Sequence, residues 1–401
     1  MNNELIIFII AFIVLVYGFF SKYLEKLNIS GPMIFLLFGI ILSPLGFNLI
    51  EIPLNSEAVK IVAEIALIIV LFTDSSSLSL KEFKFEWRIS ARLLFVGLPI
   101  TIIFSTYIAT LFFPQEPFLY LILTALILAP TDAALGKAVV TDKLVPKKIR
   151  ASINVESGLN DGIVFPLLIT VLLLIMSHQE LGNDNSWITY LFKQISLGFI
   201  VGAFMGYLGA KTLSTSVQRS WVKDVYKNLS PVALAILVYY TAEYLGGNGF
   251  IAAFVSGAFF GNFSNLVDST RENFLESEGE VLILISFLVF GLSFIPATIE
   301  FWNLKIVIYS ILSLTLFRMI PVALSLIGLG LSFKSKLFIG WFGPRGIASI
   351  LYVMTVAHKI EMVKVSNTLF SVITLTILMS IILHGLSAKP LVNLYAKSFK
   401  I

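Results

Sequence analysis

Residues 151–177 decide the fold, and they read ASINVESGLNDGIVFPLLITVLLLIMS. This run is longer than the about 20 mainly apolar residues that a membrane-spanning helix needs. It nevertheless contains two acidic residues, Glu156 and Asp161. A charge at the centre of a bilayer costs about 2.5–3.5 kcal/mol, so charges that are kept there are usually paired or functional. The stretch therefore predicts a transmembrane helix that carries a polar site.

The composition of the whole chain is that of a membrane protein. Of its 401 residues, 57% are hydrophobic and 13% are charged, whereas soluble proteins carry about 25% charged residues. A disordered chain, a nucleic-acid-binding protein and a secreted disulfide scaffold are therefore excluded. The chain has no Cys and three His, so we expect no thiolate or histidine metal centre and no cofactor.

Apolar runs between polar breaks predict an all-α membrane protein with about thirteen transmembrane helices. The predicted spans are 4–20, 32–50, 58–73, 93–113, 118–140, 151–177, 187–210, 231–245, 249–262, 279–297, 304–330, 336–357 and 366–387. With this count, most of the 28 Lys and Arg residues fall in loops on one side. Because cytoplasmic loops collect basic residues, we expect the N-terminus outside and the C-terminus in the cytoplasm.

Two of the spans contain a helix break. Span 118–140 is interrupted by Ala129-Pro130-Thr131-Asp132, and span 336–357 by Gly343-Pro344-Arg345-Gly346. They lie seven spans apart, and an odd offset reverses the orientation, so the pattern predicts two inverted six-helix repeats joined by span 187–210. Broken, crossing helices at matching places of inverted repeats are typical of a transporter with its site at mid-membrane.

A set of oxygen-bearing side chains lies beside the first break. At 3.6 residues per turn, Glu156 lies one turn from Asn160, and Ser157 one turn from Asp161. We expect Asp161 to meet the break, where the proline leaves backbone carbonyls free, and Thr131 to add a hydroxyl and a carbonyl. Such an all-oxygen set suits a hard cation. Hydroxyls also serve as plain interhelical contacts, and that alternative stays open for Ser157 and Thr131.

The other intramembrane charges are expected to compensate helix ends or each other. Asp132 would lie in the first turn of the half-helix after the first break, where an anion is stabilised. Arg345 would complement Asp132 and the facing carbonyl ends, and Arg318 would pair with Glu156. These pairs would leave Asp161 as the one titratable group for which Na+ and H+ compete.

Five further polar residues are less informative. We expect Asp74 near the inner surface as a helix cap, and Lys137 to extend toward the same surface. Glu64 is either a helix-packing contact or functional, and Glu243 either lines an outer vestibule or faces solvent. His384 is expected to be a hydrogen-bonded packing residue.

Together these motifs resemble the monovalent cation:proton antiporters of the Na+/H+ exchanger (NhaP/NHE-like) type. The segments that carry the resemblance are 129–132, 156–162, 246–255, 343–346 and 384–385. The resemblance implies thirteen helices, a homodimer, and a six-helix core that moves against a dimerising scaffold. The implied division is 1–92 for scaffold helices, 93–180 for core helices, 187–300 for a linker and scaffold helices, 301–390 for core helices and 391–401 for a short cytoplasmic tail.

By the same resemblance, Asp161 is the carrier of cation and proton, with Thr131 and Ser157 as further ligands of the transported ion. The Asn of the pair Asn160-Asp161 is similar to that of the electroneutral branch. The residues predicted to support the site are Asp132, Asn160, Glu156, Arg318 and Arg345.

The predicted function is secondary antiport of Na+ (or Li+) against H+, one for one, and not an enzymatic reaction. The expected location is the cell membrane, with the lipid bilayer and a second copy of the chain as partners. K+/H+ exchange, or an organic anion carried with Na+, stays open as an alternative. An intramembrane protease is disfavoured, because its Tyr-Asp and Gly-x-Gly-Asp signatures are absent. A channel is disfavoured by Arg318 and Arg345 beside the site.

Overall fold

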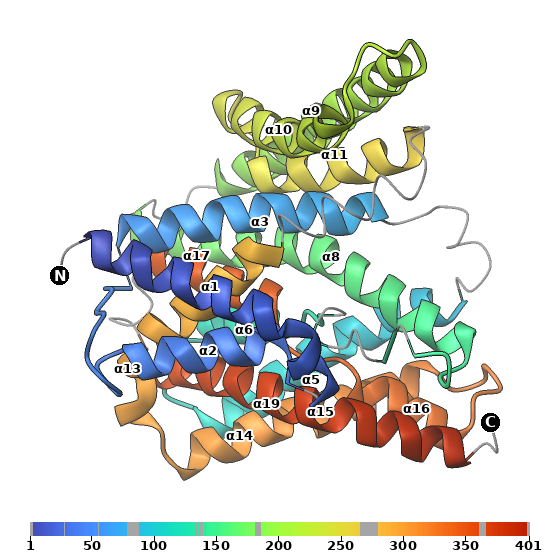
Figure 1. The fold of residues 1–401 in the computed structure, drawn as a ribbon. Helices are drawn as coiled ribbons and strands as arrows, with labels where there is room; N and C mark the ends of the chain where they lie inside the picture. The colour runs from blue at the N-terminus through green and yellow to red at the C-terminus, as the bar shows by residue number, and fades with distance from the viewer. Residues whose placement is uncertain are drawn as a thin grey trace.

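The computed structural model describes residues 3–27, 29–54, 56–77, 88–132, 135, 139–140, 142–180, 186–264, 280–360 and 366–398. Among these residues the regular structure is entirely helical, as predicted. Figure 1 shows the helices packed side by side in one bundle, with α9, α10 and α11 on one side of α3. The predicted position of Lys137 lies outside the described residues.

The described helices differ in length from about one turn to more than thirty residues. In chain order they are α1 (Asn3–Lys26), α2 (Gly31–Leu42), α3 (Glu57–Ser77), η1 (Leu93–Gly97), α5 (Leu98–Phe112), α6 (Phe118–Ile127), α8 (Lys147–Glu180), α9 (Ser186–Gln218), α10 (Asp224–Tyr244), α11 (Gly249–Phe263), η2 (Phe290–Phe294), α13 (Ile295–Thr298), η3 (Ile299–Phe301), α14 (Leu304–Leu314), α15 (Leu316–Ser325), α16 (Phe333–Trp341), α17 (Ile347–Ile360) and α19 (Asn367–Ser398).

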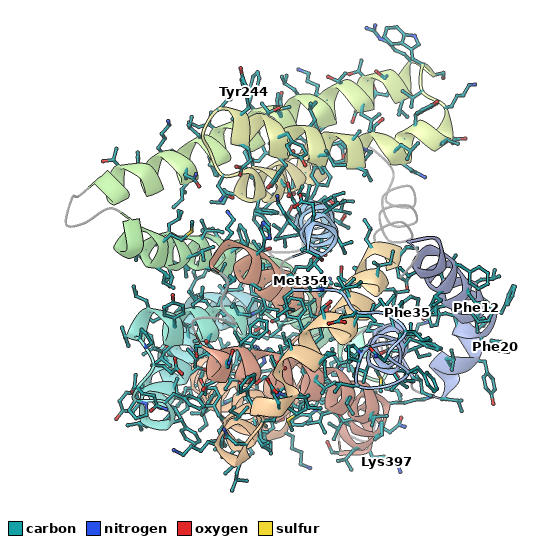
Figure 2. The ribbon with its side chains drawn as sticks, turned by 90° about the vertical axis from the view of Figure 1, so that its left-hand side faces the viewer. Phe12, Phe20, Phe35, Tyr244, Met354 and Lys397 are labelled. Carbon is teal, nitrogen blue, oxygen red and sulfur yellow. The ribbon has the colours of Figure 1, made fainter. Side chains whose placement is uncertain are left out.

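Six helical stretches of the described residues are long and apolar enough to cross a membrane. They are Arg88–Phe112, Lys147–Met176, Phe192–Gln218, Glu280–Phe301, Leu304–Ser325 and Asn367–Ser398. The outer surface fits a lipid environment: Phe12 and Phe20 of α1 are more than half exposed, and Figure 2 shows both pointing away from the bundle, whereas Met354 lies inside it. An exposed apolar surface of this kind is stable when lipid covers it.

Both predicted breaks are present, and they meet. α6 ends at Ile127 and residues 128–132 are not helical, while residues 342–346 separate α16 from α17. The backbone N–H of Asp132 donates to the carbonyl oxygen of Pro344 at 2.8 Å. Since each proline removes a backbone donor from its helix, the two interrupted segments satisfy part of each other's backbone.

A third interruption was not predicted. Span 304–330 was expected to be continuous, but α14 ends at Leu314 and α15 begins at Leu316. Between them Thr315 has φ −110° and ψ −91°, and its hydroxyl donates to the Ile311 carbonyl at 2.7 Å. A threonine that bonds back to the preceding turn can bend a helix, which is how the direction changes here without a glycine or proline.

The last helix is longer than predicted. Span 366–387 was expected to end before a short tail, but α19 continues through Pro390 to Ser398. Its final turns have a packing surface: the ring of Tyr395 lies 4.3 Å from that of Phe338, and its hydroxyl lies 2.8 Å from that of Ser335. This contact with α16 keeps residues 391–398 helical where a loose tail was expected.

Candidate ion-binding site

The irregular segment after α6 is held against α8 by side-chain hydrogen bonds. The hydroxyl of Ser157 donates to the Thr131 carbonyl oxygen at 2.7 Å. The amide of Asn160 donates to the Thr131 hydroxyl oxygen at 2.7 Å. All three residues are buried. The structure therefore brings together the hydroxyl and carbonyl oxygens that the sequence assigned to this break.

Asp161 lies one turn beyond Ser157 on α8 and is only 4% exposed. Its Oδ1 atom is buried and has no hydrogen-bond partner among the described residues, and the same holds for Oδ1 of Asn160. The Tyr352 hydroxyl of α17 donates to the backbone carbonyl of Asp161 at 3.2 Å, which fixes the helix but not the carboxyl group. A buried acceptor without a donor costs about 1–3 kcal/mol, so this carboxyl group favours a bound proton or cation.

The two breaks compensate each other's helix ends. Oδ2 of Asp132 accepts a hydrogen bond from the Ile347 N–H at 2.9 Å, at the first residue of α17. The guanidinium of Arg345 donates to the carbonyl oxygens of Ala129 and Pro130, at 3.0 and 3.4 Å. An anion thus lies at a positive helix N-terminus and a cation at a negative C-terminus.

These contacts agree only in part with the predicted ones. Arg345 reaches the facing carbonyl ends as expected. Asp132 was predicted to stabilise the half-helix that follows it, but its described bond is made to α17. Most of residues 133–141 lie outside the described part of the chain, so the original expectation stays a prediction.

Two glycines of the second break make the crossing possible. A Cβ atom on Gly346 would lie 2.0 Å from Oδ2 of Asp132, and one on Gly343 would lie 1.8 Å from Nε of Arg318. Neither distance leaves room for a methyl group. The sequence Gly343-Pro344-Arg345-Gly346 is therefore a close-packing motif as well as a helix break.

The predicted pair of Arg318 and Glu156 is present. Nη2 of Arg318 lies 3.0 Å from Oε2 of Glu156, and each side chain is 4% exposed. The interruption at Thr315 precedes Arg318 by less than one turn and so helps to set its direction. Because its charge is neutralised inside the protein, Glu156 is not available as a second free carboxylate.

His384 supports the second break from α19. Its Nε2 lies 2.9 Å from the Trp341 carbonyl oxygen at the end of α16, and its Nδ1 lies 3.0 Å from the Ser380 carbonyl oxygen. The Ser380 hydroxyl in turn accepts a hydrogen bond from the Arg345 backbone N–H at 2.6 Å. The expectation of a hydrogen-bonded packing residue fits these contacts.

Asp74 belongs to the site region, which the sequence did not indicate. It was expected beyond the end of span 58–73, as a cap near the surface, but α3 continues to Ser77. Asp74 is half-buried and interacts electrostatically with both Asp132 and Asp161. The only sequence signal was an acidic residue directly after an apolar run.

Two other acidic residues have structural partners. Glu64 accepts a hydrogen bond from the Tyr240 hydroxyl at 3.3 Å, which is the packing alternative stated for it. Oε1 of Glu243 accepts from the Gly249 N–H at 2.8 Å, and the Asn248 side chain accepts from the Ile251 N–H at 3.0 Å. Glu243 thus helps to cap α11, a role that neither of its predicted alternatives included.

A narrow pocket without room for a water molecule lies between the two breaks and α8. Its lining residues are Thr131, Asp132, Val139, Ile153, Ser157, Phe342 and Pro344. Val139, Ile153 and Phe342 also belong to the hydrophobic cluster that packs around the start of α8. The pocket is therefore a gap in the packing at the crossing of the two breaks, bordered on one side by this cluster.

Comparisons with known proteins agree on one family. The family model described as "Sodium/hydrogen exchanger, transmembrane" matches residues 8–394. A K+/H+ antiporter of Alkalimonas amylolytica, NhaP, is 24% identical over 369 residues, which are 90% of this chain and 62% of that protein. A Na+/H+ antiporter of Schizosaccharomyces pombe is 26% identical over 314 residues, which are 70% of this chain and 66% of that protein.

The fold has a solved counterpart. The structure of the sodium proton antiporter MjNhaP1 from Methanocaldococcus jannaschii at pH 8 has a TM-score of 0.80 to this chain at 22% identity, and covers 99% of this chain and 100% of that one. This likeness establishes the fold. The chain spans less than two thirds of the length of the two curated relatives.

Proposed function

The chain belongs to the sodium/hydrogen exchanger family, a family of transporters and not of enzymes, and we propose that it exchanges Na+ (or Li+) for H+ across a membrane. Asp161 carries either ion, and Thr131 and Ser157 supply further oxygens to the cation. One proton leaves the carboxyl group for each cation that enters, so the exchange is one for one.

The observation that carries this proposal is the contrast between Asp161 and the other buried charges. Glu156 and Arg318 neutralise each other, and Asp132 and Arg345 bond to helix ends. Oδ1 of Asp161, by contrast, has no partner among the described residues. Its charge is therefore the one that a mobile ion neutralises, and a single carboxylate holds a proton or a cation in turn.

One-for-one exchange moves no net charge. Each uncompensated charge that crossed the membrane would add about 2.3 kcal/mol per 100 mV to the driving force. We therefore expect exchange rates to be independent of an imposed membrane potential. An exchange that generated a potential, or became markedly faster under one, would contradict this stoichiometry.

The proposal includes alternating access by an elevator-like movement. Residues 93–180 and 301–390 form the moving core, which contains both breaks and Asp161, and residues 1–92 and 187–300 form the scaffold. We further propose that the chain forms thirteen transmembrane helices in two inverted repeats and assembles as a homodimer. It lies in the cell membrane with its C-terminus in the cytoplasm. The support for the moving core is the mutual bonding of the two breaks, which makes them one unit.

The test is dye-monitored exchange in proteoliposomes with wild type and Asp161→Asn. We expect Asp161→Asn to abolish exchange at every pH while it keeps the wild-type thermal unfolding profile. Glu57→Gln is the matched control, because Glu57 is an exposed acid that pairs only with its neighbour Lys60 in the described structure; it should exchange as wild type. Exchange retained by Asp161→Asn would assign the carrier elsewhere.

A second candidate is K+/H+ exchange. The relative from Alkalimonas amylolytica bears that activity in its name, and oxygen ligands bind K+ as well as Na+. A cation series of Li+, Na+, K+ and Rb+ at fixed pH separates the candidates. If exchange reaches half of its maximal rate at a lower concentration of K+ than of Na+, K+/H+ exchange replaces the first proposal.

A further inference from the structure

The turn between α9 and α10 carries a cluster of basic and aromatic side chains that antiport does not explain. Figure 1 shows α9 and α10 as the outermost layer of the bundle, beyond α11. Lys211, Arg219 and Lys223 are exposed, and Trp221 is 69% exposed. We define these four residues as the turn cluster.

The backbone of this turn is fixed by a specific cap. The N–H of Trp221 donates to the Ser216 carbonyl at 2.9 Å, and the N–H of Ser220 to the Val217 carbonyl at 3.0 Å. This is the bonding pattern of a Schellman cap, whose left-handed residue is usually glycine. Here it is Ser220, at φ +57°. A non-glycine residue in that region is strained, and such strain is often found where side chains are held for function.

The cap presents a stacked cation. The guanidinium carbon of Arg219 lies 4.9 Å from the centroid of the Trp221 ring. Stacking on an aromatic face holds the planar guanidinium and leaves its N–H groups able to bind oxygen atoms. Eight residues earlier, about two helical turns, Nζ of Lys211 lies 5.9 Å from the Tyr207 ring centroid. The cluster therefore holds two of its cations against aromatic rings.

The cluster has an excess of positive charge. Nζ of Lys227 lies 2.5 Å from Oδ1 of Asp224, and this hydrogen bond holds the pKa of the Asp224 carboxyl below its usual range. Asp224 thus stays ionised near neutral pH and offsets Lys227. Lys211, Arg219 and Lys223 have no acidic residue within 211–227 left to balance them.

The depth of the cluster in the membrane follows from the length of α9. Residues 194–210 carry no charged side chain, and as a helix they extend about 26 Å. This is close to the about 30 Å thickness of the hydrocarbon layer. Lys211 therefore marks the edge of that layer. The turn at residues 219–221 follows about 12 Å further along the helix axis, which places it at the outer side of the lipid headgroups.

We propose that the turn cluster binds the phosphate group of an anionic phospholipid, with Arg219 as the principal phosphate ligand, Lys211 and Lys223 as further cations, and Trp221 at the headgroup boundary. Arg is suited to phosphate because its N–H groups form paired hydrogen bonds to two oxygens. Basic clusters at this depth attract anionic lipids electrostatically. The proposal concerns lipid binding and is independent of which ions the protein exchanges.

The test is thermal unfolding of the full-length chain in a neutral detergent with added lipid. For wild type we expect phosphatidylglycerol to raise the Tm by several degrees and phosphatidylcholine to leave it unchanged, since a ligand of the folded state stabilises it. Loss of three surface cations should weaken binding roughly 100-fold. The variant Lys211→Gln, Arg219→Gln, Lys223→Gln should therefore lose this Tm increment.

Two further variants make the test specific. The control Lys334→Gln, Lys336→Gln, Lys389→Gln removes three cations elsewhere and should keep the increment. Arg219→Lys keeps the charge but loses the paired hydrogen bonds, and should weaken binding several-fold. Because each variant is compared with itself without lipid, a lower starting Tm does not obscure the result.

The proposal is overturned if phosphatidylglycerol does not stabilise wild type, or if the turn-cluster variant keeps the increment. Equal loss in the control would indicate a general charge effect. Equal stabilisation by soluble glycerol phosphate would indicate an anion site that needs no lipid. If Arg219→Lys binds phosphatidylglycerol as tightly as wild type does, Arg219 does not make the paired hydrogen bonds to phosphate that we propose.

Discussion

Replacing Gly346 by alanine tests the crossing of the two broken helices. The added Cβ would lie 2.0 Å from Oδ2 of Asp132 and 2.7 Å from both Cβ and Cγ of the same residue. Carbon atoms pack at about 3.5–4.0 Å. Rotation of the carboxylate alone cannot relieve the contact with the Asp132 Cβ, so the backbone of one break has to move by about 1 Å.

The expected cost has two parts. Displacement of Asp132 breaks its hydrogen bond to the Ile347 N–H, and a bond to a charged group contributes about 1.5–3 kcal/mol. Overpacking of a tight site adds about 1–3 kcal/mol. Gly346→Ala should therefore destabilise the protein by about 2.5–6 kcal/mol. Because the same movement displaces Thr131 from Ser157 and Asn160, exchange should be lost as well.

The assay combines thermal unfolding in detergent with dye-monitored exchange. Gly18→Ala is the matched control: Gly18 is a helical glycine whose added Cβ would meet nothing within 4 Å, so it should be neutral or gain up to about 1 kcal/mol. The double variant with Asp132→Ala removes the clashing carboxylate and should be less destabilised than the sum of the two single variants. The described contact would be refuted if Gly346→Ala kept the wild-type Tm and exchange rate. It would also be refuted if the destabilisation of the double variant equalled the sum of the two single variants.

Three further outcomes are expected. Arg318→Met should destabilise the protein by about 3–5 kcal/mol, because it leaves Glu156 buried without its partner; thermal unfolding should show most of the loss restored when Glu156→Gln is added, and no restoration would contradict the pairing. Ser157→Ala should raise the apparent KM for Na+ several-fold with a smaller effect on maximal rate, and an unchanged KM would leave its hydroxyl as a packing contact only. Asp74→Asn removes a negative charge that interacts with Asp161, so the apparent KM for Na+ should rise in the same exchange assay; an unaltered or lower KM would exclude Asp74 from the ion pathway.

The features that the sequence predicted are those decided by local chemistry or by the cost of burial. Pro130 and Pro344 interrupt their helices because proline lacks a backbone donor, and this is visible without a structure. The pairing of Arg318 with Glu156 was predictable because a buried arginine inside a membrane span needs an opposite charge as its partner. The position of Asp161 one turn after Ser157 follows from helical periodicity alone.

The features that it missed depend on how helices meet. Thr315 interrupts a span without a glycine or proline, so no local residue type announced the change of direction. The acceptor role of Asp132 toward α17 requires that two segments more than 200 residues apart in sequence cross at one point. Asp74 was assigned to a surface because the predicted span ended at residue 73, whereas α3 continues to Ser77; an error of about four residues at a helix end is enough to move a charge from solvent to the site.

The crossing explains how several buried charges coexist in so small a volume beside the proposed ion site. A broken helix presents a negative end at its first half and a positive end at its second half, and two such helices placed together would repel if like ends met. Here Arg345, from the second break, bonds to the carbonyl end of α6, while Asp132, from the first break, bonds to the N–H end of α17. Each helix thus supplies the charge that the other requires, and the crossing is neutral without any ion from solution. Under the proposed mechanism, binding of a proton or a cation at Asp161 changes the charge of the site without disturbing the charges that hold the two helices together.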